Sequence, residues 1–325
     1  MKLIIQIPCY NEAKTLATAL KHIPREIEGV DKVELLIIND GSTDNTVEIA
    51  GENGVDHIVS FSKNKGLARG FMAGLDECIK KGADIIVNTD ADNQYNANDI
   101  PKLIKPILDG KADMVVGERP ISKTKHFSPI KKFLQKMGSR VVRMVSKTNI
   151  PDAPSGFRAM SKDAAMRLNV FNDYTYTLET IIQAGQKDMA ITSVPVRTNE
   201  DLRPSRLVKS IFSYIKRSIA TIIRIFVIYR PFRFFFTIGF ILFLTGFIIG
   251  IRFLVLYFQG EGQGNIQSLI LAAILLIIGF QTILMAFQSD IQAANRKLME
   301  DIQYRIKKLE NPDDDEDDEE YNKEE

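Results

Sequence analysis

Two carboxylates stand one residue apart in this sequence, at Asp90 and Asp92, with the small Ala91 between them. They directly follow a run that is typical of a β-strand, so both side chains are expected to point the same way from the strand end. Carboxylate oxygens in this arrangement hold Mg²⁺ or Mn²⁺ and leave further coordination positions for water and substrate phosphates. Asp is also frequent in turns and at helix caps, so the pair alone leaves the metal site undecided.

Other charged residues at neighbouring strand ends favour a site for a metal and a diphosphate. Asp40 follows the second predicted strand, and Gly41 after it permits a tight turn. Arg119 follows the fifth predicted strand, where its guanidinium can pair with phosphate oxygens in a bidentate way. Together with Asp90 and Asp92, these residues predict a phosphate-binding edge.

The elements that must position these residues alternate between strand and helix over the first two hundred residues. The β-rich runs are residues 2–7, 33–38, 57–61, 84–88 and 112–116, and helical patterns begin near Glu12, Asp44, Gly66 and Asn98. This alternation predicts an α/β wound sheet, in which ligands bind beyond the carboxyl ends of the strands. We therefore expect residues 1–205 to form one cytoplasmic catalytic domain with its site at that edge.

Glycine, cysteine and histidine spacing excludes several classes of site. Gly66, Gly70 and Gly74 recur every four residues, which gives a bare helix face that can approach the sheet but fits neither a P-loop nor a dinucleotide fingerprint. Two isolated cysteines and three scattered histidines support neither a disulfide framework nor a zinc site. No nucleic-acid partner is expected.

Two long apolar runs follow the predicted catalytic domain. Residues 234–258 are interrupted only by Arg252, and residues 266–288 carry no charge. Each run is long enough to cross a bilayer as a helix, and the segment between them is too short for a domain. Residues 231–290 are therefore expected to form a hairpin of two transmembrane helices. A buried helical hairpin of a soluble protein is the alternative.

Charge asymmetry predicts the orientation of this hairpin. Between Arg203 and Arg233 there are eight basic residues and no acid, and five more basic residues follow the second run. By the positive-inside rule, both flanks and both termini are expected in the cytoplasm. Residues 206–230 show the two faces of an interfacial amphipathic helix, and residues 291–310 show the pattern of a polar cytoplasmic helix. Residues 311–325 hold ten acids against one lysine and are predicted to be a disordered tail without a catalytic role.

Five ordered motifs resemble one known family. They are IPCYNE (7–12), INDGSTDNT (38–46), NTDADNQY (88–95), GER (117–119) and SGFRAMSK (155–162). In this order they resemble the family 2 glycosyltransferases with a GT-A fold, over roughly residues 1–210. Within that family the chain looks like the polyprenyl-phosphate glycosyltransferases, the group of dolichyl-phosphate mannose synthase and the bacterial undecaprenyl-phosphate glucosyltransferases. A two-helix C-terminal anchor also occurs in that group.

The resemblance implies a role for each matching residue. Pro8, Tyr10, Glu12 and Asp40 would border the base and ribose of a nucleotide sugar; Asp90, Asp92 and Gln94 would bind Mg²⁺ or Mn²⁺ and the diphosphate; Arg119 would contact phosphate; Ser155 and Arg158 would lie beside the lipid phosphate; Arg203 and Arg206 would close over the donor. The implied catalytic residues are Asp92, Arg119 and Arg158. The chain departs from the family where DADNQY replaces a DADLQHP-like pattern, and this leaves the donor open.

The implied reaction moves a hexose from a nucleotide sugar to a polyprenyl phosphate, such as undecaprenyl or dolichyl phosphate. A lipid monophosphate is already an oxyanion at neutral pH, so no dedicated general base is required. In-line attack at C1 would invert the anomeric centre. We expect a UDP-sugar as the donor and leave GDP-mannose open. Arg252 within the first apolar run leaves a homo-oligomer open.

Two other functions are weighed against this one. A processive polysaccharide synthase shares the donor motifs, but its QxxRW sequence needs a tryptophan, and this chain has none. A non-catalytic membrane protein that binds sugar nucleotides is the second alternative, and tight nucleotide binding without turnover would favour it.

Overall fold

The computed structural model describes residues 1–120, 139–170, 176–199, 220–221, 223–260 and 262–312. These residues fall into two compact units. One unit comprises Met1–Lys216 and Asp301–Glu325, and the other comprises Arg217–Glu300. The described strands all belong to the first unit, whereas the second is built on two long helices.

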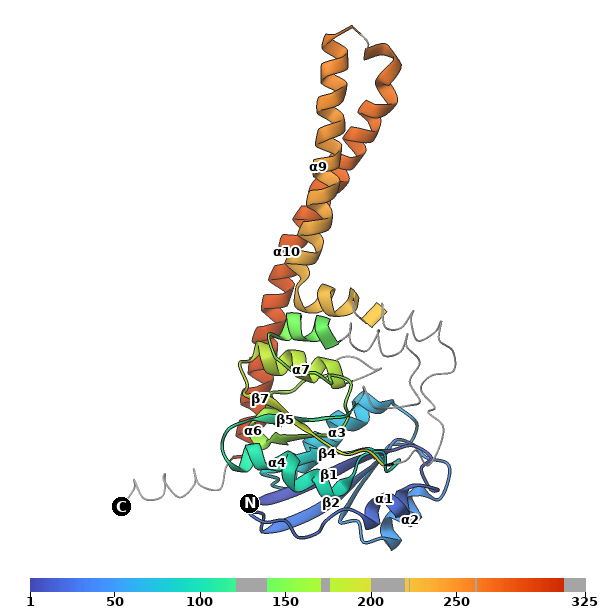
Figure 1. Ribbon diagram of the computed structural model, residues 1–325, viewed down its shortest axis with the longest axis vertical. Helices are drawn as coiled ribbons and strands as arrows, with labels where there is room; N and C mark the ends of the chain where they lie inside the picture. Colours follow the sequence, from blue (N-terminus) through green and yellow to red (C-terminus); the bar gives the residue numbers. More distant parts are fainter. Residues whose placement is uncertain (121–138, 171–175, 200–219, 222, 261, 313–325) are drawn as a thin grey trace, which may run out of the picture. The chain divides into compact units, whose positions relative to one another are not determined.

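The strands of the first unit form a seven-stranded sheet in the order β3-β2-β1-β4-β6-β5-β7 (Figure 1). They are β1 (Lys2–Cys9), β2 (Lys32–Asn39), β3 (His57–Ser60), β4 (Ile85–Asn88), β5 (Met114–Glu118), β6 (Arg158–Ser161) and β7 (Ile191–Pro195). The first five match the predicted strands, and neighbours run parallel except that β6 is antiparallel to both β4 and β5. The predicted α/β sheet is confirmed, with an antiparallel insertion that the sequence pattern did not indicate.

Apolar side chains on both faces of the sheet explain why helices cover it on both sides. In β1, Leu3, Ile5 and Ile7 belong to one buried cluster, and Ile4 belongs to another. A strand that is buried on both faces is typical of a parallel sheet between two helix layers. The helices that contribute to the first cluster are α1 (Leu16–Lys21), α2 (Thr46–Glu52) and α4 (Ile100–Leu108), and those of the second are α3 (Leu67–Lys80), α6 (Lys162–Arg167) and α7 (Thr177–Gln186).

Helix α3 lies close to the sheet because it carries glycine on the face that meets it. A Cβ atom at Gly74 would lie 2.3 Å from Gln6 Oε1 and 2.8 Å from Ile38 Cδ1, so no side chain fits there. At Gly70 the nearest atom to such a Cβ is Ile38 Cγ2, at 3.7 Å. The predicted bare face is thus confirmed at these two glycines, whereas Gly66 precedes the helix with a φ of 93°.

Helix α10 (Ile266–Glu310) is one continuous helix, although a membrane span and a separate polar helix were predicted for its two parts. Its C-terminal end, from Asp301, belongs to the first unit. There, Tyr304 Oη donates a hydrogen bond to Asp163 (2.6 Å), and Lys307 Nζ pairs with Asp76 (2.7 Å). These contacts fix the end of α10 to α6 and α3.

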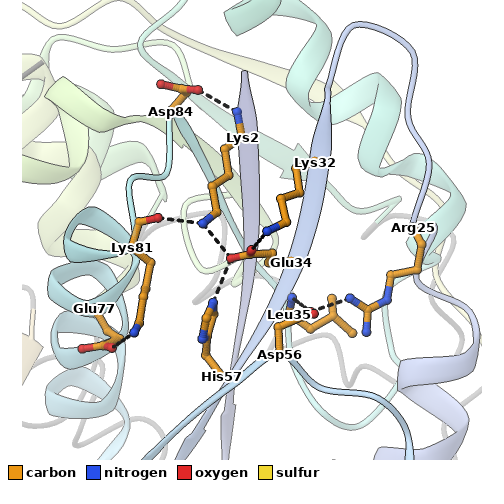
Figure 2. A network of polar contacts seen from close by, with 10 residues as sticks. All are labelled: Lys2, Arg25, Lys32, Glu34, Leu35, Asp56, His57, Glu77, Lys81 and Asp84. Atoms are coloured by element: carbon orange, nitrogen blue, oxygen red, sulfur yellow. Dashed lines mark hydrogen bonds and ion pairs between the residues drawn. The ribbon is translucent and has the colours of Figure 1, made fainter. Parts of the chain in front are cut away.

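A cluster of charged residues closes the amino-terminal edge of the sheet, away from the predicted site (Figure 2). The buried Glu34 carboxylate of β2 pairs with Lys2 Nζ (2.8 Å), Lys32 Nζ (2.7 Å) and His57 Nε2 (2.8 Å), all from strand beginnings. Burial alone would raise the pKa of Glu34, but the hydrogen bonds from Lys2, Lys32 and His57 outweigh burial and lower it to about 2. The ionised carboxylate therefore stabilises the register of β1, β2 and β3.

Replacing this carboxylate should destabilise the first unit in a pH-dependent way. Glu34→Gln is expected to cost about 2 kcal/mol of unfolding free energy at pH 7, because hydrogen bonds to a charged acceptor are lost. A depressed folded-state pKa contributes stability above the unfolded value of 4.5, and this contribution is lost as the pH falls towards about 2. Thermal unfolding of both proteins between pH 7 and pH 3 measures the difference. Glu77→Gln, which removes an exposed pair with Lys81, is the control and should change stability by less than about 0.5 kcal/mol.

In the second unit, α9 (Pro231–Phe258) and the first part of α10 pack as an antiparallel pair. Gly239 lies against Gly279, and Gly246 lies against Ala272. Residue numbers therefore increase along α9 and decrease along α10 in the same direction, as expected for antiparallel helices. Small residues let two helix backbones approach closely. By length and composition both helices could cross a membrane, and most of their large apolar side chains are exposed.

Because the two helices approach each other so closely, the stability of the pair should fall strongly when one methyl group is added between them. A Cβ at Gly279 would lie 2.5 Å from the main-chain nitrogen of Phe243, so Gly279→Ala must push the helices apart. We expect the melting temperature of the detergent-solubilised protein to fall by several degrees. Gly250→Ala is the matched control, because its Cβ would meet Ala272 at an ordinary 3.9 Å. Equal melting temperatures for the two variants would contradict the observed packing.

Candidate active site

The carboxyl ends of the parallel strands bring the predicted site residues to one edge of the sheet. The register pairs Cys9 of β1 with Asn39 of β2, and Gln6 of β1 with Asn88 of β4. The segments that follow these strands therefore leave the sheet at the same edge, and Arg119 follows β5 there as well. These are the segments that hold Tyr10, Glu12, Asp40, Asp90, Asp92 and Gln94.

Asp40 and Glu12, which were predicted to border a nucleotide, are buried and fix loops of this edge. The Asp40 carboxylate accepts hydrogen bonds from the main-chain nitrogens of Lys65 (2.6 Å) and Gly66 (2.9 Å), directly before α3. Glu12 Oε2 accepts one from Thr15 Oγ1 (3.0 Å). Both carboxylates thus shape the loops that surround the site.

The segment at Pro8 and Tyr10 lies next to these loops. Pro8 is half-buried, whereas Tyr10 is 43% exposed. Asn11, to which the sequence reasoning gave no role, adopts a left-handed φ of 54°. Its Oδ1 accepts a hydrogen bond from the main-chain nitrogen of Thr43 (2.8 Å), and its own nitrogen donates to Ser42 Oγ (3.0 Å). Asn11 therefore joins the loops that follow β1 and β2.

Asp90 and Asp92 lie in the loop after β4, both half-buried. Burial and the neighbouring charge of Asp92 raise the pKa of Asp90 to about 7. Two carboxylates that repel each other in a poorly solvated place are stabilised by a cation between them. Within the described residues, no group of three His, Cys, Asp or Glu side chains gathers to hold a metal ion. Carboxylate oxygens such as those of Asp90 and Asp92 are ligands that Mg²⁺ accepts together with water and phosphate oxygens.

The loop that carries these carboxylates is ordered by its own hydrogen bonds. The main-chain nitrogen of Gln94 donates to Asp92 Oδ1 (3.1 Å). A Cβ at Gly156 would lie 3.0 Å from Asp90 Oδ2, so the glycine leaves room for the carboxylate. Sequence reasoning had assigned no role to Gly156, although it lies within the motif at 155–162.

Arg119 forms a bidentate ion pair that local sequence did not reveal. Its Nε and Nη2 donate to Asp152 Oδ2 (2.8 Å) and Oδ1 (3.0 Å), and its main-chain nitrogen donates to Oδ2 (3.2 Å). Asp152 has almost no exposed surface, whereas 14% of the Arg119 side chain is exposed. The pairing with Asp152 fixes the guanidinium in one orientation.

Arg158 and Ser155, which were predicted to lie beside a lipid phosphate, are completely buried in the structure. Arg158 Nη1 donates to the main-chain oxygen of Thr177 (3.1 Å), and Nη2 donates to that of Ser155. The guanidinium also lies over the ring of Tyr176, 5.4 Å from its centroid, and burial lowers the pKa of Arg158. Ser155 Oγ and Arg158 Nε have no hydrogen-bond partner among the described residues. The acceptor role of both residues stays a prediction.

A buried chain of amides and hydroxyls lies directly behind the two carboxylates. Gln6 Nε2 donates to Asn88 Oδ1 (3.0 Å), and Asn88 Nδ2 donates to the Gly156 oxygen (2.9 Å) and to Tyr176 Oη (2.8 Å). The nitrogen of Gly156 in turn donates to Tyr95 Oη (3.0 Å). This chain joins β1, β4 and the segment before β6. Two further predicted site residues, Arg203 and Arg206, lie outside the described residues.

Comparison with known proteins gives the family of this chain. The family model described as glycosyl transferase family 2 matches residues 4–168. A UDP-N-acetylglucosamine–dolichyl-phosphate N-acetylglucosaminyltransferase of Methanococcus voltae is 30% identical over 217 residues, which cover 59% of this chain and 83% of that protein. An undecaprenyl-phosphate mannosyltransferase of Micrococcus luteus is 24% identical over 206 residues, which cover 60% of this chain and 83% of that protein.

A solved structure supports the fold independently. Glucosyl-3-phosphoglycerate synthase from Mycobacterium tuberculosis, determined in complex with Mn²⁺, UDP and glucosyl-3-phosphoglycerate, superimposes with a TM-score of 0.52 at 19% identity. The match covers 70% of this chain and 78% of that one. The predicted GT-A fold is thus confirmed, and the family model accounts for half of the sequence, including the strand-end segments that carry Asp40, Asp90, Asp92 and Arg119. This chain belongs to glycosyl transferase family 2.

Proposed function

We propose that this chain transfers a hexose from a UDP-sugar to a polyprenyl phosphate. The observation that carries the proposal is the pair Asp90 and Asp92 beside Arg119 at one edge of the sheet, in a chain of glycosyl transferase family 2. The relatives in Methanococcus and Micrococcus are named for sugar transfer to dolichyl and undecaprenyl phosphate, and this favours a lipid phosphate as the acceptor.

A divalent metal fits the carboxylate pair by its chemistry. Asp90 and Asp92 would hold Mg²⁺ or Mn²⁺, and Gln94 is the third predicted ligand. When bound, the ion offsets the negative charge that develops on the leaving nucleoside diphosphate. The raised pKa of Asp90 supports this assignment, because a bound cation would offset both the burial and the charge of Asp92 that raise it. The neighbour from Mycobacterium was solved with Mn²⁺ and UDP, in line with metal use.

The chain's own residues would orient the reactants. Arg119, which Asp152 holds in one orientation, would bind a phosphate oxygen of the donor. The exposed ring of Tyr10 would stack on the nucleotide base. The acceptor phosphate is already ionised at neutral pH, so the site needs to align it with C1 and does not need to remove a proton. In-line attack of this oxyanion from the side opposite the leaving diphosphate inverts the anomeric centre.

The two apolar helices of the second unit would anchor the enzyme where such an acceptor resides. A polyprenyl phosphate presents its charge at the membrane surface. Basic residues flank the apolar stretches and favour a cytoplasmic location for both termini: Arg224 and Arg230 before α9, Arg233 in its first turn, and Arg296 and Lys297 in α10. A soluble acceptor would not require this arrangement.

Transfer of label from a panel of UDP- and GDP-sugars to organic-extractable lipid tests the proposal. Purified full-length protein is incubated with a polyprenyl phosphate and Mg²⁺ or Mn²⁺, with and without chelator. We expect label in the lipid phase from one UDP-sugar, dependent on metal, and a product of inverted configuration by NMR. Nucleotide binding without transfer from any donor would overturn the acceptor assignment and favour a binding protein. Retained configuration would contradict in-line attack.

A further inference from the structure

Residues 196–199, which we call the strap, follow β7 and run alongside the loop that carries Asp92 and Gln94. Tyr95 and Thr198 form an antiparallel bridge, and the nitrogen of Asn96 donates to the Arg197 oxygen (3.1 Å). The strap ends, within the described residues, at Asn199, whose own nitrogen donates to the Gln94 oxygen (2.9 Å). Main-chain hydrogen bonds thus join two segments that lie about a hundred residues apart in the sequence.

The side chain of Asn199 adds a second set of contacts to the same loop. Its Nδ2 donates to the main-chain oxygens of Asn93 (2.9 Å) and Tyr95 (3.2 Å), and it lies 3.3 Å from Asn93 Oδ1. One amide group therefore bridges both ends of the turn at Asn93–Tyr95. Only a side chain with two donor hydrogens and this short reach can serve both carbonyl oxygens together.

The turn that Asn199 bridges has an uncommon backbone conformation. Asn93 adopts a φ of 58°, in the left-handed region where residues other than glycine are uncommon, although asparagine enters it more often than most. Its neighbours on either side are Asp92 and Gln94, joined by the hydrogen bond from Gln94 N to Asp92 Oδ1. If Asn93 relaxed, the main chain on both sides would rotate and Asp92 would move relative to Asp90. Such a conformation persists only where surrounding contacts hold it.

We infer that Asn199 is a positioning residue for the divalent-metal ligands, because its side-chain amide holds the turn between Asp92 and Gln94 in one conformation. The inference rests on the proposed use of a metal. Metal sites require their ligands within about half an ångström of the productive geometry, and partners behind the ligands supply that precision. Asn199 would act through the loop and touch neither the metal nor the substrate.

The strap has anchors that do not depend on this amide. Arg197 pairs with the buried Asp99 through its Nη2 (2.8 Å), and its main-chain nitrogen donates to the same carboxylate (2.7 Å). The nitrogen of Val196 donates to the Glu118 oxygen (2.9 Å). A variant of Asn199 should therefore keep the strap in place and lose mainly its hold on the turn.

Binding of Mn²⁺ in the presence of UDP, measured by electron paramagnetic resonance of the free ion, tests this role without relying on turnover. The full-length protein in detergent is compared with Asn199→Ala and with Asn199→Leu, which has nearly the size of asparagine but lacks the amide donors and adds no charge. We expect both variants to weaken Mn²⁺ binding about tenfold, with melting temperatures close to wild type. Asn53→Ala is the matched control, because Asn53 Nδ2 also donates to a main-chain oxygen, that of Ile49 (2.8 Å), in α2.

The outcomes separate this inference from the proposed function. Wild-type protein that binds Mn²⁺, together with variants of Asn199 whose affinity falls less than threefold, overturns the positioning role alone. Wild-type protein that binds no more Mn²⁺ than Asp92→Asn overturns the metal site and the positioning role with it. If Asn199→Ala melts well below wild type, Mn²⁺ binding by Asn199→Leu and the Mn²⁺ dependence of sugar transfer decide between the two explanations. An unchanged Mn²⁺ requirement counts against the inference.

Discussion

Asp92→Asn is expected to lower the rate of sugar transfer about a thousandfold while the protein remains folded. Asparagine has the size of aspartate, and its Oδ1 can still accept the hydrogen bond from the nitrogen of Gln94 that orders the loop. The substitution removes one negative charge from the pair with Asp90, so a divalent cation loses a ligand and the leaving diphosphate loses its counter-charge. Initial rates of label transfer to lipid, at saturating donor and metal, measure the effect.

A control and a melting curve make this test decisive. Asp109→Asn removes an exposed carboxylate that pairs only with Lys105 and Lys111 among the described contacts, and it should transfer sugar at the wild-type rate. Thermal unfolding should be similar for wild type and both variants. Activity of Asp92→Asn within threefold of wild type would refute the metal assignment.

The sheet could be predicted from the sequence because its strands are buried on both faces. Runs such as those of β1 and β2 are apolar at nearly every position, and this pattern is local. β6 has no such signal. It is four residues long, begins with the charged Arg158, and runs antiparallel between β4 and β5, so its identity as a strand depends on neighbours far away in the chain.

The end of the second long apolar helix could not be placed from hydropathy. Apolar residues give way to polar ones near Asp290, and this change was taken to separate a span from a second helix. The residues beyond it are good helix formers without glycine or proline before Pro312, so α10 continues to Glu310. Hydropathy reports the surroundings of a helix, whereas its end depends on helix-breaking residues.

The residues of the candidate site also fall into two groups: those whose position the local sequence indicates and those whose contacts lie far away in the chain. The common position of Asp40, Asp90, Asp92 and Arg119 at one edge of the sheet could be predicted because they follow strands closely, and the sheet brings strand ends together. Asp152 and Asn199 could not, because each acts on a segment at a large sequence separation, as in the pairing of Asp152 with Arg119. The local sequence around Asp152 and Asn199 does not indicate which residue each of them contacts.

Arg158 is the residue for which resemblance and packing suggest different experiments. Its motif resembles that of a residue beside the lipid phosphate, whereas its side chain is completely buried and donates to main-chain oxygens of Ser155 and Thr177. These oxygens belong to the segment before β6 and to the start of α7. A guanidinium that joins two such segments contributes to stability, because its removal leaves buried carbonyl groups unpaired.

Arg158→Lys is therefore expected to lower the melting temperature by about 10 °C, since each buried carbonyl oxygen left unpaired costs about 1–3 kcal/mol. Lysine keeps the charge but lacks the planar fork that reaches both oxygens. Arg305→Lys, at an exposed arginine paired with Asp301, is the control and should melt like wild type. Differential scanning fluorimetry in detergent measures both.

Steady-state kinetics on the folded fraction of Arg158→Lys separate the two roles. If the arginine only joins the segments, the KM for the polyprenyl phosphate and the KM for the donor should stay close to wild type at a temperature where the variant is folded. If it also meets the acceptor, the acceptor KM should rise more than the donor KM. A wild-type melting temperature combined with a raised acceptor KM would refute the structural role, because a guanidinium that binds the lipid phosphate cannot keep all its hydrogen bonds to the main chain.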